Sequence, residues 1–252
     1  MLPIKRPGSG LLAAAAAAAT LLAAAPAAHA VTRMTMKSSI KPNKGPIGSP
    51  INLKIGFTLD PADPNVDPDT ITRVVVLFPP NARPNGKLFP ACSAAQINLA
   101  KSFRRCPKGS MIGKGGGFAD VTAVPVRHVP YRLTFFNGSR NGKVITVHAR
   151  ATNPVDINLA FDAALVKTSG RYGYRLTFNL PDALQEIYPG WFAQVRTLNS
   201  TIRAFYKVKG RRIPYIQSTT LCPKSKFVPI ASTYSFLDGS STNVDARIAC
   251  RR

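Results

Sequence analysis

The sequence predicts an all-β protein, a large antiparallel β-sandwich (Ig-like or jelly-roll-like) with two local disulfides. Three observations predict this class. Apolar and polar residues alternate with a period of two over many short segments, as half-buried strands require. The chain contains 22 prolines, which exclude long helices. Its four cysteines are an even number in a chain that begins like an exported protein, which favours disulfides.

The first 30 residues have the composition of an export signal. Lys5 and Arg6 supply a positive start, residues 11–25 form an apolar segment, and Ala28-His29-Ala30 is a small-x-small cleavage site. The apolar segment is shorter than the ~20 residues that cross a bilayer, and no later stretch reaches that length. We therefore expect a signal peptide over 1–30 and no membrane span after its cleavage. The mature chain is expected to be secreted, extracellular or at the cell surface.

Strands are expected wherever the alternation is sustained. It is clearest in five segments, 51–59, 172–180, 202–208, 228–236 and 244–250. Weaker patterns predict further strands at 32–40, 71–78, 118–124, 131–136, 143–150, 157–166 and 191–198. Turn dipeptides of the Asn-Gly and Lys-Gly type lie between them.

Only two short helices are expected. The first covers residues 93–101, with Ser93 as its N-cap. The second covers residues 182–188 and is stopped by Pro189-Gly190. Both are short interruptions in a chain of strands.

We expect one domain over residues 31–252, because a single sandwich often reaches ~200–250 residues. The alternative is two Ig-like halves that meet near 125–130. Each half would hold one cysteine pair and one Cys-Pro-Lys sequence. The single domain is favoured because no linker-like stretch lies near the middle of the chain.

Four cysteines allow three pairings. We predict Cys92–Cys106 and Cys222–Cys250, because each pair is local and brackets one supersecondary unit. Zinc is a poor alternative, because the chain has no CxxC and only His128 and His148 follow the signal. No metal site and no cofactor are expected.

The chain is strongly basic. Without Lys5 and Arg6, 32 basic residues face 11 acidic ones, a net charge of +21. Such a charge favours association with polyanions, although arginine-rich coding could also produce it. Two clusters are the candidate anion-binding residues: Lys101, Arg104, Arg105 and Lys108 in the first cysteine loop, and Lys207, Lys209, Arg211 and Arg212 in an expected hairpin. Neither cluster has the interleaved aromatic residues that single-stranded nucleic acid requires, so no specific nucleic acid is expected.

Catalytic signatures are absent from the sequence. No GxSxG occurs, and Glu186 is the only glutamate, whereas glycosidases need two carboxylates. His128 and His148 are both expected on the surface. The glycine-rich run 109–117 departs from the phosphate-loop spacing and is interpreted as a bulged strand entry. We therefore predict no catalytic residue.

Four of the 11 acidic residues lie together in one proline-rich loop. They are Asp60, Asp63, Asp67 and Asp69. Clustered carboxylates can bind Ca²⁺, but the spacing matches no EF-hand. A solvated connector is the favoured interpretation, and calcium binding stays open.

The segment from Cys106 to Gly115 resembles the Cys-Pro-x-x-Ser-x-Ile-Gly-x-Gly pattern of secreted proteins from high-GC Gram-positive bacteria. Cys222-Pro223, the segment 234–241 and Cys250 resemble the C-terminal hairpin of the same uncharacterised proteins. The resemblance implies the β-sandwich fold, the disulfides and export. It implies no activity.

Together these features predict a secreted, non-catalytic surface or matrix protein. Its expected partner is an anionic polymer or polysaccharide of the cell envelope, bound through the basic clusters. The alternative is an extracellular carbohydrate-active or hydrolytic enzyme.

Overall fold

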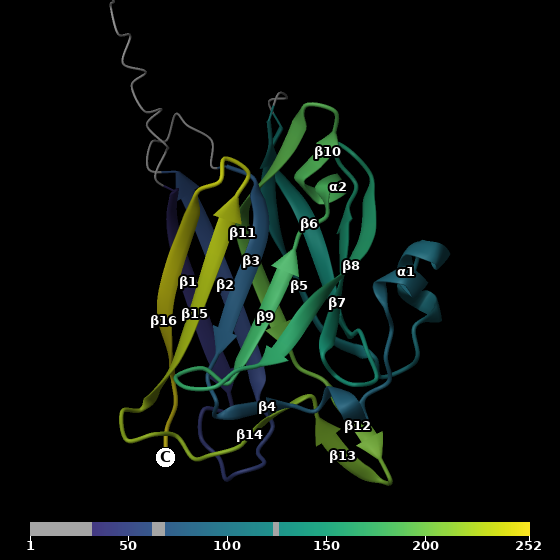
Figure 1. The fold of residues 1–252 in the computed structure, drawn as a ribbon. Coiled ribbons are helices and arrows are strands. Elements are labelled where there is room, and N and C mark those ends of the chain that lie inside the picture. The colour runs from purple at the N-terminus through teal and green to yellow at the C-terminus, as the bar shows by residue number, and fades with distance from the viewer. Residues whose placement is uncertain (1–31, 62–68, 123–125) are drawn as a thin grey trace, which may run out of the picture.

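A computed structural model of the chain describes residues 32–61, 69–122 and 126–252. The expected signal peptide lies outside these residues, as do Asp63 and Asp67 of the acidic loop. Antiparallel strands dominate the part that is described, which confirms the all-β class (Figure 1).

Most strands belong to one sheet. They are β1 (Thr32–Lys41), β2 (Asn52–Pro61), β3 (Ile71–Phe78), β5 (Met111–Val121), β6 (Val126–Asn137), β7 (Val144–Ala151), β8 (Ile157–Lys167), β9 (Tyr174–Asn179), β10 (Glu186–Tyr188), β11 (Trp191–Ile202), β15 (Phe227–Phe236) and β16 (Ser241–Ala249). Two small sheets pair β4 (Ala82–Pro84) with β14 (Ile216–Ser218), and β12 (Phe205–Val208) with β13 (Arg211–Pro214). The helices are α1 (Ala94–Ala100) and α2 (Asp182–Gln185), with the 3-10 turns η1 (Gly86–Leu88) and η2 (Phe103–Arg105).

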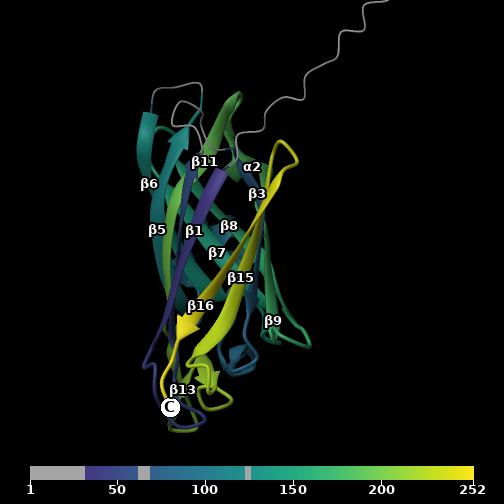
Figure 2. The same cartoon turned by 90° about the vertical axis from the view of Figure 1, so that its left-hand side faces the viewer.

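The main sheet curls round on itself. Within the described residues it has 12 strands in the order β1-β2-β11-β5-β6-β7-β8-β9-β3-β15-β16, with β10 beside β11. β1 and β16, at the two ends of this order, pack against each other (Figure 2). The structure therefore corrects the expected two-layer sandwich to a single, nearly barrel-shaped sheet. The reason is that pairing continues without a break while the strands twist, which brings the two ends together.

Strands from the two halves of the sequence are interleaved in this sheet. β11 lies between β2 and β5, and β3 lies between β9 and β15. A boundary near residues 125–130 would therefore separate hydrogen-bonded neighbours. The sheet is held by long-range pairs such as Phe57 with Leu198.

Most local elements follow from the sequence, but β4, β10 and β14 were not predicted and β5 begins earlier than the expected strand 118–124. Ser93 caps α1 as expected: its hydroxyl accepts from the Gln96 amide, and the Gln96 side chain accepts from the Ser93 amide. The second expected helix is shorter, because the chain turns into β10 at Glu186. The expected strand 202–208 is interrupted between Ile202 and Phe205, where the chain leaves β11 for the β12–β13 hairpin.

Both predicted disulfides, Cys92–Cys106 and Cys222–Cys250, are confirmed. The first encloses α1 and η2. The second joins the end of β16 to the segment before β15, and Cys250 is buried beside Val228 and Ile248. Two disulfides are typical of a protein that works in an oxidising, extracellular environment.

Candidate functional site

An apolar cavity of about 370 Å³ lies inside the curled sheet. Apolar side chains from many strands line it, among them Phe57, Val76, Leu133, Val147, Leu176 and Leu198. The same alternation that predicted the strands supplies these residues, because every second side chain faces inward. The volume falls within the ~300–1,000 Å³ typical of small-molecule sites.

Short segments cross both ends of the sheet. At the end near the C-terminus, β4 and β14 run below the main strands (Figure 1). Gly48 and Ile51 are hydrogen-bonded to Ser218 and Ile216, which holds the β1–β2 loop against β14. At the opposite end, Leu184 after the start of α2 and Ile187 of β10 contribute to the lining. Strands thus surround the sides of the cavity, and short elements lie across parts of its two ends.

Tyr215, between β13 and β14, contributes to the lining of the cavity. Its backbone amide donates to Ala204 O (2.9 Å), and its carbonyl accepts from Asn85 N (2.7 Å). Its ring is 2% exposed and stands edge-on to Phe89, with ring centroids 5.1 Å apart. Burial raises the pKa of the Tyr215 phenol well above its usual value. Tyr215 is therefore a rigidly held, neutral phenol.

A second tyrosine, Tyr131 of β6, also lines the cavity. Its hydroxyl donates to Thr197 O of β11 at 2.7 Å. Desolvation raises the pKa of the Tyr131 phenol too. Near the other end, the guanidinium of Arg150 is paired with Asp156 at 2.5 Å across the β7–β8 turn.

The structure places all eight candidate anion-binding residues at exposed positions. Lys101 ends α1, Arg104 and Arg105 belong to η2, and Lys108 follows the first disulfide. The other four lie on the β12–β13 hairpin, which confirms the expected hairpin. Arg212 stacks over the ring of Phe205 at 4.0 Å from its centroid, so its guanidinium is held in place.

One contact connects the two clusters. The backbone of Gly109, next to Lys108, lies against the ring of Tyr206, next to Lys207. A Cβ on Gly109 would come within 2.5 Å of Tyr206 Cδ2. The tertiary structure therefore brings into contact two segments that are distant in sequence and that each carry one of the basic clusters.

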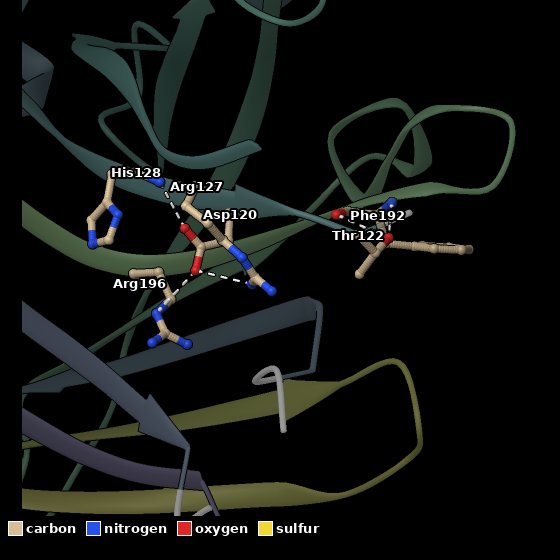
Figure 3. Close-up of polar contacts among 6 residues, drawn as sticks. All are labelled: Asp120, Thr122, Arg127, His128, Phe192 and Arg196. Carbon is tan, nitrogen blue, oxygen red and sulfur yellow. Dashed lines mark hydrogen bonds and ion pairs between the residues drawn. The ribbon is translucent and has the colours of Figure 1, made fainter. Parts of the chain in front are cut away.

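A buried ionic cluster lies at the other end of β5, at Asp120 (Figure 3). The side chain of Asp120 is 3% exposed, accepts from the His128 amide at 2.8 Å, and lies 3.5 Å from the guanidinium groups of both Arg127 and Arg196. β5 and β6 shift register here, and His128 has a positive φ of 56°. These donors surround the carboxylate. We therefore interpret the cluster as one that stabilises the irregular pairing of β5 with β6.

The two histidines differ in their exposure to solvent. His128 is exposed, as expected. The expectation for His148 is wrong: it is 5% exposed, its Nε2 lies 2.7 Å from Asn158 Oδ1, and Phe103 packs against its ring. It occupies the polar side of β7, but η2 and α1 cover that side. Glu186 accepts from the Gly190 amide and stabilises a turn.

The glycine-rich run enters β5 with a register shift at Met111 and Gly113, as a bulged strand entry. Of the acidic loop, Asp69 accepts from the Thr70 and Asp238 amides. Within residues 32–61, 69–122 and 126–252, no group of three or more His, Cys, Asp or Glu side chains could hold a metal ion. No helix in these ranges combines the length and the hydropathy needed to cross a membrane.

Comparisons with known proteins assign no family. No protein-family model matches the chain, and no curated protein matches it. A solved structure described as "AvmM Catalyzes Macrocyclization in Alchivemycin A Biosynthesis" is 10% identical, covers 87% of this chain and 90% of its own, and superimposes with a TM-score of 0.26. A likeness this slight carries no argument about fold or function.

The sequence pointed to the basic clusters and missed the cavity. The apolar face of each strand was apparent from the alternation. That face is equally consistent with a cavity and with a fully packed core. Tyr131 and Tyr215 carried no distinguishing pattern. The feature that the fold defines is an apolar cavity within a curled antiparallel sheet.

Proposed function

We propose that this chain is a secreted, non-catalytic protein that binds an apolar small molecule inside its curled sheet. The cavity is the observation that carries the proposal. A cavity of this volume leaves many apolar side chains without packing partners on one side. A protein retains so large an apolar space more readily if a ligand fills it.

The walls favour a ligand with little charge. An ionised group placed among the apolar side chains would lose its hydration, and the charged residues of the lining are few: Lys44, Arg150 and Arg251. Apolar contact alone supplies about 25 cal/mol for each Å² removed from water. A ligand of this kind is poorly soluble, so an extracellular protein that encloses it would act as a carrier or a reservoir.

The experiment measures binding of the uncharged fluorescent probe N-phenylnaphthylamine to the purified protein. Leu133→Trp places a larger side chain in the cavity and should abolish or strongly reduce the fluorescence increase. Arg132→Trp is the matched control, because Arg132 is adjacent on β6 and exposed on the opposite face. The proposal fails if the wild-type protein does not bind the probe, or if both variants bind it as the wild type does.

A second function is supported by the two exposed basic clusters. We propose that the same protein associates with anionic polymers of the cell envelope through its two basic clusters. The supporting observation is the Gly109–Tyr206 contact, which brings the clusters together. Such association would keep a ligand-binding protein close to the cell that exported it. The two functions are separable, because probe binding in the cavity should be insensitive to salt and polymer binding should not be.

A further inference from the structure

The lining of the cavity reaches the protein surface at the end near the C-terminus (Figure 1). Six residues of the lining are exposed at this end: Pro42, Asn43, Lys44, Thr220, Leu221 and Arg251. In the part of the lining that the structure describes, Asn153 is the one exposed residue at the opposite end. Because the exposed lining residues gather at one end, we take this end as the mouth of the cavity.

Three segments that are distant in sequence surround the mouth. They are residues 41–51, 218–227 and 250–252, which we call the rim. The carbonyl of Asn43 accepts from Arg251 N at 2.6 Å, so the first and third segments are in contact. Arg252 Nε donates to Cys222 O at 3.1 Å, and the Cys222–Cys250 disulfide joins the second and third segments covalently. The rim is therefore a single surface that the tertiary structure holds together.

Every charged side chain of the rim is basic. The six are exposed and belong to neither of the two basic clusters: Lys41, Lys44, Lys224, Lys226, Arg251 and Arg252. Within the described residues, the ion pairs of the protein involve none of them. Acidic residues such as Asp69, Asp156 and Asp238 lie in the loops at the opposite end. This separation of charge orients the protein, because an anionic surface attracts the end that carries the mouth.

Exposed apolar side chains lie among these cations. Ile47, in the β1–β2 loop, is 64% exposed, and Leu221, which also belongs to the cavity lining, is 56% exposed. A soluble polyanion offers such side chains no apolar surroundings. The boundary between lipid headgroups and acyl chains takes up apolar side chains, while anionic headgroups attract the neighbouring cations. The combination of charge and apolar exposure favours a bilayer over a soluble polymer at the rim.

We propose that the rim docks onto an anionic lipid bilayer, with its cations on the headgroups and with Ile47 and Leu221 in the interfacial layer. The mouth of the cavity then faces the membrane, and an apolar ligand passes between bilayer and cavity without crossing water. This transfer rests on the proposed function, because it requires that the cavity holds an apolar molecule. The docking itself does not.

The first test measures flotation of the purified protein with vesicles of phosphatidylcholine, alone or mixed in equal parts with phosphatidylglycerol. The wild type should bind only the anionic vesicles. Ile47→Ser combined with Leu221→Ser retains every charge and should weaken this binding by about tenfold or more. Leu237→Ser is the matched control, because Leu237 is 49% exposed in the β15–β16 turn at the opposite end, and it should bind as the wild type does.

The second test determines which end meets the membrane. Trp191, the one tryptophan of the chain, begins β11 at the end opposite the rim. Vesicles with brominated acyl chains should therefore leave the fluorescence of the wild type unquenched. Ile47→Trp adds a tryptophan to the rim, and the same vesicles should quench its fluorescence.

Three results would overturn the docking: no preference of the wild type for anionic vesicles, wild-type binding by the Ile47→Ser/Leu221→Ser variant, or equal quenching in the wild type and Ile47→Trp. The second result would show that the rim contacts polyanions through charge alone. Unchanged circular dichroism and a cooperative melt establish that the variants are folded. Binding of N-phenylnaphthylamine without vesicles tests the cavity separately, so its failure would remove the transfer and leave the docking.

Discussion

Gly109 lies directly against the ring of Tyr206, so that its backbone occupies space where no side chain would fit. The residue has a positive φ of 91°, which a glycine adopts without strain. The contact joins the segment after the first disulfide to the β12–β13 hairpin. It is the link between the two basic clusters.

Gly109→Ala should therefore destabilise the protein by about 1–3 kcal/mol, because it adds a clash to an unfavourable backbone conformation. Gly210→Ala is the control: it also has a positive φ, of 78°, but an added Cβ would meet nothing within 4 Å. It should cost about 1 kcal/mol from the backbone alone. Urea unfolding measures both, and equal losses would show that the Tyr206 contact contributes nothing.

The two basic clusters should bind polyanions in a salt-dependent manner. Lys207→Glu, Lys209→Asp and Arg211→Glu together reverse the exposed charges of the hairpin and keep Arg212 on Phe205. Binding to purified teichoic acid should weaken in this variant, and wild-type affinity should fall steeply with salt because counterions are released. Probe binding in the cavity serves as the control for folding. Wild-type affinity that does not change with salt would refute the polyanion proposal.

Replacing Asp120 in the buried ionic cluster should cost more stability than replacing Asp156 in its exposed ion pair. Asp120→Ala should cost about 1–3 kcal/mol, because the His128 amide loses its acceptor and two guanidinium groups lose their carboxylate. Asp156→Ala should cost less than about 1 kcal/mol, because the side chain of Asp156 is 66% exposed and its pair with Arg150 is solvated. Chemical denaturation measures the difference, and a larger loss for Asp156→Ala would contradict it.

The buried tyrosines should make the protein less stable in alkali. Burial raises the pKa of Tyr215 and Tyr131 above 10.0 in the folded state. Above about pH 10 the unfolded chain loses phenolic protons that the folded protein retains. The contribution of these two groups to the unfolding free energy is therefore fully present below that pH and falls above it. Tyr215→Phe removes one such group and should reduce the fall between about pH 9 and pH 11. An unchanged fall would show that Tyr215 titrates normally when folded.

The sequence by itself determined the local elements. Alternation with a period of two depends only on neighbouring residues, and it identified strands such as β15, whose burial alternates along its length. The Ser93 cap and the two disulfides were also predictable, because each depends on residues close together in the chain. The two basic clusters could be identified from the sequence, because runs of charged residues are normally exposed to solvent.

Only the tertiary structure decided which strands pair and that the two ends of the sheet meet. The order β2-β11-β5 depends on pairs such as Phe57 with Leu198, and no periodicity in either strand specifies its partner. For this reason the alternation of apolar and polar residues is the same for a sandwich and for a curled sheet. His148 shows the same limit: its position on the polar side of β7 was correct, but burial depended on α1 and η2 packing over that side. The cavity arises from this closure, because inward-facing side chains enclose space only when the first and last strands of the sheet meet.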